Sequence, residues 1–347
     1  MSEFYDLEAD EQCRLLERLG RVALTEWGID KDAELRLIKH RENTIFKVTE
    51  REGAQSYALR VHRARYNTPD EIRSELQWMH ALRHAGILTP EVIPTADGML
   101  THEARSKGVP ESRTVDLFRW IDGCELGRIE DGGSDDPETL AKYRLVGATA
   151  ARLHNHASAW PLPAGFTRHA WDEAGLLGGQ PLWGRYWESE LLDEGQRLQL
   201  TAIREDARVL LEQFGTSPDR YGLVHADLVP ENLMIAGSDV YVIDFDDMGF
   251  GWHLFDLATI MFWHLGTGYY DALLRSVITG YRSQRALADD LLEWFPLFLV
   301  LRGTTYIGWC HTRRETQFAR DMGRWVISVM AQLLGSGHKM LSGITER

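Results

Sequence analysis

Hydrophobic positions in the first third of the chain alternate with polar ones, or run together, over stretches as long as a β-strand. The stretches 34–38, 44–49 and 57–61 have this pattern and are separated by short polar segments. A period of two residues is typical of strands that bury one face. The pattern predicts an antiparallel meander, which further strands at 91–94 and 112–121 extend.

Helical periodicity replaces this pattern in one early segment and in most of the later chain. Residues 69–85 have apolar side chains three or four positions apart, with Thr68 as the expected N-cap and Glu75 on or beside the apolar face. The segments 138–159 and 198–214 have the same spacing. A further helix near the N-terminus is expected to pack on the sheet.

The most informative polar residues lie between positions 225 and 247. The segment HADLVPEN (225–232) is followed by an apolar strand and the acidic stretch DFDD (244–247). Transfer of a phosphoryl group requires that its charge be neutralised and that the acceptor hydroxyl be held in line. Asp227 suits the carboxylate near that hydroxyl, and the side-chain oxygens of Asn232 and Asp244 suit Mg²⁺. The motif predicts phosphoryl transfer.

Each of these residues also has a purely structural interpretation. An aspartate before an asparagine is typical of a turn or cap, and an aspartate after an apolar strand is a common turn residue. The joint pattern of HxDxxxxN, a hairpin-length gap and a strand ending in DFDD is much rarer by chance, and it favours phosphotransfer. Asp256, at a predicted helix start, either caps that helix or ties down the loop.

Between residues 223 and 258 the chain resembles the aminoglycoside phosphotransferase, choline kinase and type II homoserine kinase group, which shares the two-lobed fold of protein kinases. The resemblance extends over about residues 30 to 330. It implies that Asp227 is the catalytic base, that Asn232 and Asp244 bind Mg²⁺, and that ATP binds between the lobes. It also implies that His225 braces the catalytic loop as a scaffold residue.

The same resemblance divides the chain into three parts. These are an N-terminal helical extension (1–30), a nucleotide-binding lobe (31–122) and a catalytic and substrate-binding lobe (123–347). The turn signal Asp122-Gly123 lies at the expected crossing between the lobes. The expected fold class is α+β, with a small antiparallel sheet and one main helix in the first lobe and mostly helices in the second.

In the first lobe, a basic residue on a predicted strand and a glutamate on the predicted helix occupy the positions that such a kinase requires. The resemblance implies that Arg60, on the third strand, contacts the α and β phosphates of ATP and that Glu75 holds it in place. The family often has lysine at this position, but arginine keeps the charge and binds phosphate through a fork of donors. The alternative is an ordinary exposed strand arginine beside a solvated helix glutamate.

Other nucleotide contacts have less support in the sequence. No GxGxxG or GxxxxGK[ST] motif occurs, and Asn43, in the polar loop between the first two strands, fits either a phosphate donor or a plain hairpin turn. By resemblance, backbone groups from Phe118 to Ile121 meet the adenine. Asp246 replaces the glycine of the protein-kinase DFG triplet, either to orient the metal ligands or to bind a second metal.

Composition narrows the substrate class. The net charge of −14 argues against nucleic acid as a substrate and favours a cationic acceptor. An aromatic and acidic pocket would suit such an acceptor. The three cysteines lie far apart, and no secretion signal or membrane span is visible, so a cytoplasmic protein is expected. His154 and His156, two positions apart on one helix, face different sides and do not predict a metal site.

Together these features predict an ATP- and Mg²⁺-dependent kinase that phosphorylates a hydroxyl of a small molecule, such as an amino alcohol, a hydroxy amino acid or an aminoglycoside. A protein serine/threonine kinase of the same fold is the alternative, although no APE signature or activation segment follows DFDD. A nucleotide-binding pseudokinase is a third possibility, against which the complete set of Asp227, Asn232 and Asp244 argues. The pattern does not specify the acceptor, the choice of ATP or GTP, or the oligomeric state.

Overall fold

The computed structural model describes residues 3–50, 55–127, 132–237 and 239–345, with side chains up to residue 335. These residues form two compact units. The first comprises the described parts of Met1–Cys124, Leu162–Thr167 and Ile235–Asp246, and the second those of Glu125–Pro161, Arg168–Met234 and Asp247–Arg347. No helix among the described residues combines the length and apolarity needed to cross a bilayer. The functional division into 1–30, 31–122 and 123–347 stays a prediction.

The first unit is built on a five-stranded antiparallel sheet in the order β1-β2-β3-β5-β4. Its strands are β1 (Glu34–His40), β2 (Thr44–Thr49), β3 (Ser56–Val61), β4 (His102–Ala104) and β5 (Arg113–Arg119). The predicted meander is therefore present. The predicted strand at 91–94 forms only an isolated bridge between Val92 and Phe118. Pro90 precedes this segment and Pro94 ends it, and neither has a backbone N–H to donate to a neighbouring strand. The short strand β4 was not predicted.

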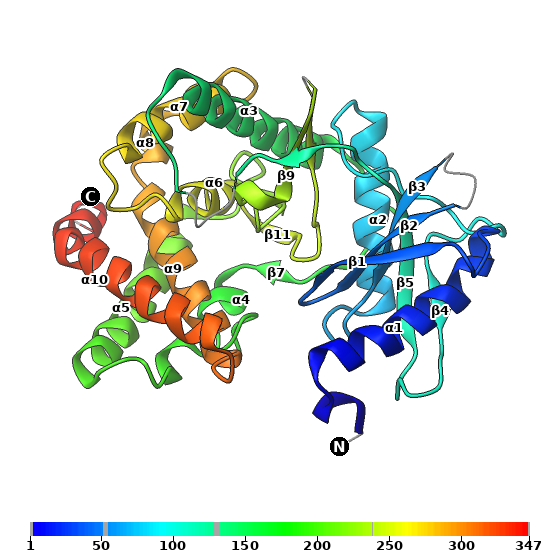
Figure 1. Ribbon diagram of the computed structural model, residues 1–347. Helices are drawn as coiled ribbons and strands as arrows, with labels where there is room; N and C mark the ends of the chain where they lie inside the picture. The colour runs from blue at the N-terminus through cyan, green and yellow to red at the C-terminus, as the bar shows by residue number, and fades with distance from the viewer. Residues whose placement is uncertain (1–2, 51–54, 128–131, 238, 346–347) are drawn as a thin grey trace. The chain divides into compact units, whose positions relative to one another are not determined.

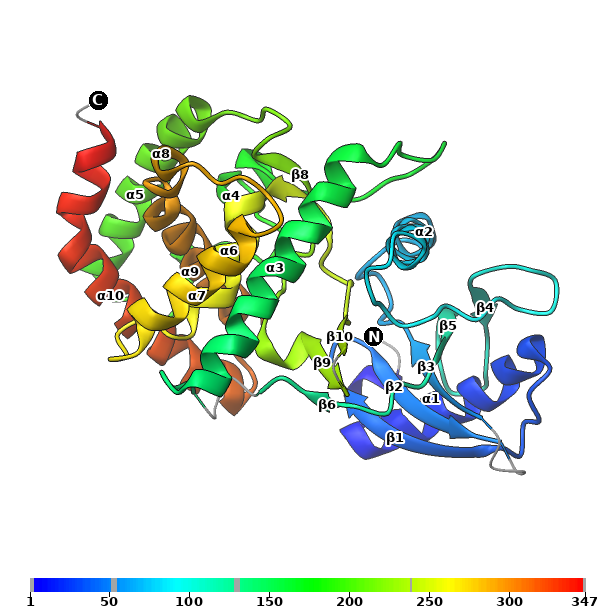
Figure 2. The ribbon, with the colours of Figure 1, turned by 90° about the horizontal axis from the view of Figure 1, so that it is seen from above.

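Helices cover both faces of this sheet (Figures 1 and 2). On one face, α1 (Ala9–Ala23) packs Leu16 and Leu19 against a core that contains Leu59 and Leu117. On the other face lies α2 (Pro69–His84), which begins with the predicted cap as a full capping box at Thr68. Burial of the amphipathic face of α1 explains how the N-terminal helix joins this unit.

The second unit is mostly helical (Figure 1). Its helices are α3 (Pro137–Ala159), α4 (Glu173–Leu177), α5 (Glu194–Phe214), α6 (His253–Phe262), α7 (Tyr270–Arg282), α8 (Asp289–Leu292), α9 (Phe295–Thr312) and α10 (Gln317–Thr345). The predicted helices at 138–159 and 198–214 are confirmed as α3 and α5. Every residue of α6 is buried, so α6 is a central element of this unit.

Two small sheets complete the described structure. One has the order β7-β11-β8, from β7 (Ala170–Trp171), β8 (Tyr221–Val224) and β11 (Gly249–Trp252). The other has the order β10-β9-β6, from β6 (Cys124–Glu125), β9 (Leu233–Ala236) and β10 (Asp239–Val242). Short 3₁₀ turns lie at Glu3–Asp6, Leu24–Trp27, Tyr186–Glu188 and Pro230–Asn232. The predicted apolar strand before DFDD is thus β10.

Glycine allows α3 and α7 to pack at close range. A Cβ atom added to Gly280 would lie 1.8 Å from the carbonyl oxygen of Arg144. Overpacking costs about 1–3 kcal/mol, so we expect Gly280→Ala to lower the free energy of unfolding in urea by at least that amount. Gly335→Ala on α10, where an added Cβ meets nothing within 4 Å, is the control and should be neutral or stabilising. Equal stability of the two variants would contradict this packing.

Candidate active site

The loop 225–232 of the second unit is anchored by a carboxylate from α6. Asp256 Oδ2 accepts the backbone N–H of His225 at 3.0 Å, and Oδ1 accepts that of Ala226 at 2.7 Å. Ala226 has a φ of 65°, in the left-handed region that L-residues rarely adopt, and the two hydrogen bonds hold this turn. Of the two roles that the sequence allowed for Asp256, tying down the loop is confirmed.

His154 on α3 supports Asp256 from behind. Its Nε2 lies 3.0 Å from Asp256 Oδ2 and its Nδ1 lies 2.9 Å from the hydroxyl of Tyr281. Burial alone would raise the pKa of Asp256, but the hydrogen bond and charge of His154 outweigh it and hold that pKa below its usual value. The carboxylate of Asp256, which holds the loop, therefore stays ionised. His154 is a structural residue, and no pattern in the sequence indicates this role.

Asp227 and Asn232 lie together in this loop. The side chain of Asp227 is 24% exposed. Asn232 Nδ2 donates to Asp227 Oδ2 and to its backbone oxygen, both at 2.9 Å. Because both bonds use the amide nitrogen, they leave the amide oxygen of Asn232, the atom that a cation binds, uncommitted. An accessible carboxylate beside an amide oxygen is chemically suited to act next to a bound cation.

Arg302 on α9 was not predicted, yet it contacts Asp227 directly. Its Nη2 donates to Asp227 Oδ1, and its Nη1 donates to the carbonyl of Ala226, both at 2.9 Å. The guanidinium is fully buried and lies over the ring of Tyr306 at 4.1 Å and that of Trp183 at 4.7 Å. These rings therefore already hold a cation of the protein itself. The only signal in the sequence was an arginine within a strongly apolar helix.

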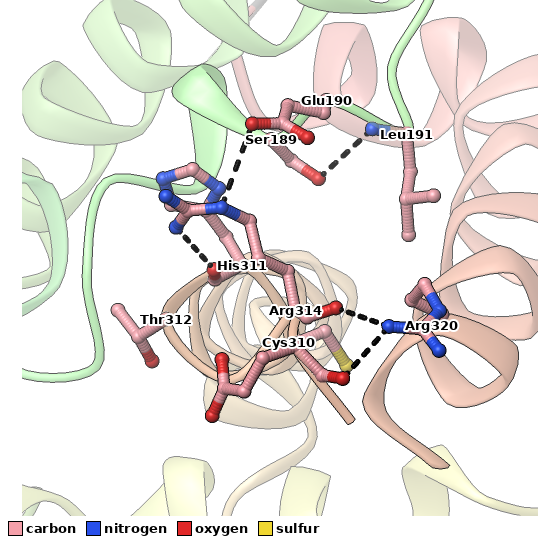
Figure 3. Close-up of a pocket in the computed structure, with 9 residues that line it drawn as sticks. Ser189, Glu190, Leu191, Cys310, His311, Thr312, Arg314 and Arg320 are labelled. Carbon is pink, nitrogen blue, oxygen red and sulfur yellow. Dashed lines mark hydrogen bonds and ion pairs between the residues drawn. The ribbon is translucent and has the colours of Figure 1, made fainter. Parts of the chain in front are cut away.

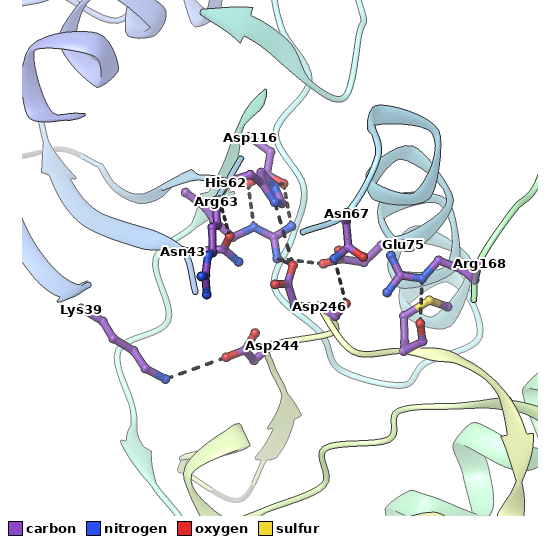
Figure 4. Close-up of polar contacts among 12 residues, drawn as sticks. Lys39, Asn43, His62, Arg63, Asn67, Glu75, Asp116, Arg168, Asp244 and Asp246 are labelled. Carbon is purple, nitrogen blue, oxygen red and sulfur yellow. Dashed lines mark hydrogen bonds and ion pairs between the residues drawn. The ribbon is translucent and has the colours of Figure 1, made fainter. Parts of the chain in front are cut away.

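Arg60 in the first unit is the centre of a buried cluster of charged side chains (Figure 4). Its Nη1 donates to Glu75 Oε1 at 2.8 Å, so this predicted pair does lie together. Its Nε and Nη2 donate to the two oxygens of Asp116 at 3.0 and 2.6 Å. Asp116 is directly opposite Arg60 in the β3–β5 register, which explains the two-pronged contact. The Arg60 side chain is only 6% exposed.

The charges of this cluster shift one another's pKa values. Burial acts to raise the pKa of Asp116, but the charges of Arg60 and of His62, 2.9 Å away, lower it to about 2. Burial and the charge of Glu75 raise the pKa of Asp246 to about 7. Asp246 Oδ1 lies 3.8 Å from Arg60 Nη1. This buried position favours an orienting role for Asp246 over a second metal ligand, which stays a prediction.

Asp244 lies two residues beyond β10 and is accessible. It has a φ of 62°, and its side chain is 39% exposed, with Oδ2 3.9 Å from Lys39 Nζ. A non-glycine residue held in the left-handed region is common at functional sites. Its carboxylate is the hard oxygen donor that Mg²⁺ prefers. The chemistry of this residue therefore fits the predicted ligand role.

The remaining predicted nucleotide residues also lie in the first unit. Asn43 Oδ1 accepts the backbone N–H of Arg63 at 3.1 Å, so its side chain braces the turn between β1 and β2. Phe118 is buried on β5 with Arg60 Cζ 5.0 Å from its ring centre, and Ile121 is half-buried just beyond that strand. The contacts of these three residues with adenine or phosphate stay predictions.

A pocket of about 550 Å³ lies at the C-terminal end of α9 in the second unit (Figure 3). It is lined by Ser189, Glu190, Leu191, Cys310, His311, Thr312, Arg314, Glu315 and Arg320. Part of this polar lining is bonded within itself: Arg314 Nε lies 3.5 Å from Glu190 Oε1, and Arg320 Nη1 donates to the backbone carbonyl of Arg314 at 2.7 Å. None of the predicted site residues lines this pocket, so we do not assign it to the site.

Comparison with known proteins identifies the family. Residues 34–289 match the model of the phosphotransferase enzyme family, APH. Amicoumacin kinase of Bacillus subtilis (strain 168) is 25% identical over 306 residues, which are 85% of this chain and 84% of that protein. A solved microcompartment-associated aminopropanol kinase is 32% identical, with a TM-score of 0.79 over 94% of this chain and 98% of its own.

A second solved structure extends the comparison. It is an amicoumacin kinase in complex with AMP-PNP, Ca²⁺ and Ami, with 19% identity and a TM-score of 0.73 over 90% of this chain and 92% of its own. The predicted α+β kinase-like fold and the predicted class of enzyme, a small-molecule kinase, are confirmed. The chain belongs to the phosphotransferase enzyme family.

Proposed function

We propose that this protein is an ATP- and Mg²⁺-dependent kinase that transfers the γ-phosphoryl group to a hydroxyl of a small amine-bearing molecule. The observation that carries the proposal is the accessible carboxylate of Asp227, 2.9 Å from the amide of Asn232, in a chain of this family. The name of one similar enzyme, aminopropanol kinase, and the net charge of −14 both support an amino alcohol or related amine as acceptor.

The proposed chemistry assigns the base role to Asp227. As the hydroxyl oxygen of the acceptor forms its bond to the γ-phosphorus, the bond between that phosphorus and the bridging oxygen breaks, ADP leaves, and Asp227 accepts or orients the hydroxyl proton. Arg302 and Asn232 donate to its two oxygens, which fixes the direction of the carboxylate. Most of the rate gain then comes from positioning and charge neutralisation.

The proposed metal ligands are Asn232 and Asp244, through their side-chain oxygens. Bound Mg²⁺ would neutralise the charge of the transferred phosphoryl group. The assignment of Arg60, Glu75, Asn43, Phe118 and Ile121 to nucleotide binding is likewise part of this proposal. A relative solved with AMP-PNP and Ca²⁺ supports the use of a nucleotide and a divalent metal.

The acceptor class is testable by measuring ADP release from Mg·ATP with a panel of acceptors. The panel contains amino alcohols, hydroxy amino acids, choline-like amines, aminoglycosides and a generic protein substrate. The proposal predicts that at least one amine-bearing alcohol raises ADP release well above the rate without acceptor. Stimulation by the protein substrate alone would support a protein kinase instead.

Arg302 provides a test of how Asp227 is oriented. Lysine keeps the positive charge, but it cannot reach Asp227, Ala226 and Tyr306 with the fork of donors that Arg302 uses. A displaced catalytic group can cost about 10²-fold in rate, so Arg302→Lys should lower kcat by about 10- to 100-fold with little change in the KM for ATP. Arg324→Lys makes the same exchange at an exposed position on α10, so it is the control and should keep the wild-type kcat. Full turnover by Arg302→Lys would contradict this role.

A further inference from the structure

We propose that a pocket of about 310 Å³ in the first unit binds a small molecule that carries a carboxylate or phosphate group, and that this binding is coupled to that of the metal and nucleotide. The pocket lies where the segment 62–68, which leads from β3 into α2, meets β4 and the start of β5. Its volume is in the range of small-molecule sites. The lining contains none of the residues to which the proposed function assigns a role, so this is a second binding site.

Arg113, the first residue of β5, is a buried cation of the lining whose donors are mostly unused. Its side chain is 4% exposed, and Glu111 Oε2 is 3.6 Å from Nη2, farther than a hydrogen bond. Nη2 donates to the hydroxyl of Tyr5 at 3.2 Å, and no other described residue accepts a hydrogen bond from this guanidinium. The rings of Phe4 and Tyr5, 5.5 and 5.9 Å from Cζ, help to hold the charge. Because a buried polar group without an acceptor is costly, the remaining N–H groups favour binding of an anion.

The charged side chains of the lining favour an anion over a cation. Three arginines, Arg63, Arg65 and Arg113, outnumber two glutamates, Glu103 and Glu111. Arg63 and Arg65 are exposed, so their side chains can move to meet a ligand. In a chain with a net charge of −14, such a local excess of positive charge attracts anions to one place. A guanidinium group binds two oxygens of a carboxylate or a phosphate at once.

The two carboxylates of the lining already have partners. Glu103 Oε1 accepts from the hydroxyl of Thr114, and Glu111 Oε1 accepts from that of Tyr5 at 2.8 Å. Arg65 Nη2 is 3.9 Å from Glu111 Oε1, but the Arg65 side chain is 86% exposed, and such a pair contributes little. Glu111 Oε2 accepts no hydrogen bond from any described residue. A ligand that carries a hydroxyl beside its anionic group therefore suits this lining.

Two residues of the lining connect the pocket to Asp246 (Figure 4). His62 Nε2 is 2.9 Å from Asp116 Oδ2, and its Nδ1 is 3.9 Å from Asp246 Oδ1. Asn67 Nδ2 donates to the backbone oxygen of Asp246 at 3.0 Å. Asp246 is two positions beyond Asp244, the proposed metal ligand. A ligand that holds the segment 62–68 thus acts on the metal site, and this coupling, unlike the binding itself, rests on the proposed function.

Methyl NMR of the full chain tests the site, because Ile72 lines the pocket and is buried. The protein carries ¹³C-labelled δ1 methyl groups on its isoleucines and is titrated separately with inorganic phosphate and with malate. We expect at least one probe to shift the Ile72 signal to saturation, and the tighter probe shows whether the site prefers a phosphate or a carboxylate. Ile203, on α5 of the second unit, should not shift.

Variants of the arginines test which groups bind the probe. Arg113→Lys keeps the charge but loses the fork of donors, so it should weaken the tighter probe by about tenfold. The exposed variant Arg63→Gln/Arg65→Gln should weaken it by at least about threefold, and it decides the question if Arg113→Lys does not fold. Arg14→Gln/Arg18→Gln removes the same charge from exposed positions on α1 and should bind like the wild type.

The outcomes separate the site from its coupling. Absence of a saturable shift at Ile72 with both probes would overturn the site, and so would equal weakening by the two double variants, which would be an effect of net charge. With saturating Mg·AMP-PNP, the affinity of the probe should change by at least about fivefold, and an unchanged affinity would refute the coupling. If the wild type does not bind Mg·AMP-PNP, the proposed function fails, whereas a saturable shift at Ile72 still supports the site.

Discussion

Asp227→Asn should reduce turnover by about 10²- to 10⁴-fold, the usual loss when a general base is removed. The amide cannot accept the hydroxyl proton, whereas it keeps the shape of the side chain and one acceptor oxygen for Arg302. Nucleotide binding involves other residues of the proposed site, so the affinity for Mg·AMP-PNP should change little. Steady-state kinetics and calorimetry on the same preparation would measure the two effects separately.

A control is needed for the general effect of removing an acidic side chain from the second unit. Asp206, exposed on α5, provides it, and Asp206→Asn should have wild-type turnover. Near-normal turnover of Asp227→Asn would show that Asp227 is not the base. A parallel loss of nucleotide affinity in Asp227→Asn would instead point to a disturbed loop.

The second large effect is expected on stability, in Arg60→Met. The variant leaves Asp116, Glu75 and Asp246 buried without the guanidinium that their contacts share. Removing one partner of a buried ion pair costs about 3–5 kcal/mol, and we expect a loss of that size in the free energy of unfolding at pH 8. The double variant Arg60→Met/Asp116→Leu, which also removes the main acceptor, should recover part of the loss.

The pH dependence of this loss has a definite sign. In the wild type, the pKa of Asp116 is lowered to about 2, so its stabilising contribution is complete above its usual pKa near 4 and is lost as the pH falls toward 2. In Arg60→Met the buried carboxylates should instead have raised pKa values. Their unfavourable contribution then grows with pH, so between pH 5 and pH 8 the variant should fall further below the wild type in stability as the pH rises. A loss independent of pH would contradict this account of the cluster.

Local patterns predicted much of the fold because the relevant interactions are close in sequence. The capping box of α2 lies within four residues, from Thr68 to Glu71, and the alternation in β2 reflects its own two faces. Asp227 and Asn232 meet because five positions in a tight loop bring them together. The strand predicted at 91–94 is only a bridge. The apolar pattern favoured a strand there, but Pro90 and Pro94 have no backbone N–H to donate to a neighbouring strand.

The supporting residues of the site depend on contacts that no local pattern encodes. Arg302 is 75 positions from Asp227, His154 is 102 from Asp256, and Asp116 is 56 from Arg60. Each pair forms only when helices or strands pack in the folded unit. A buried charged residue within an apolar stretch, such as Arg302 on α9, is the one trace that such a contact leaves in the sequence.

The fate of the γ-phosphoryl group itself decides whether this protein phosphorylates a small-molecule hydroxyl. The protein is incubated with Mg²⁺, ATP carrying an ¹⁸O-labelled γ-phosphoryl group, and the acceptor that most stimulates ADP release, and the products are analysed by mass spectrometry. We expect a labelled phosphomonoester on a hydroxyl of that acceptor, and almost none with Asp227→Asn. Label found only in inorganic phosphate, or only on an added protein, would show that the protein is not a small-molecule kinase.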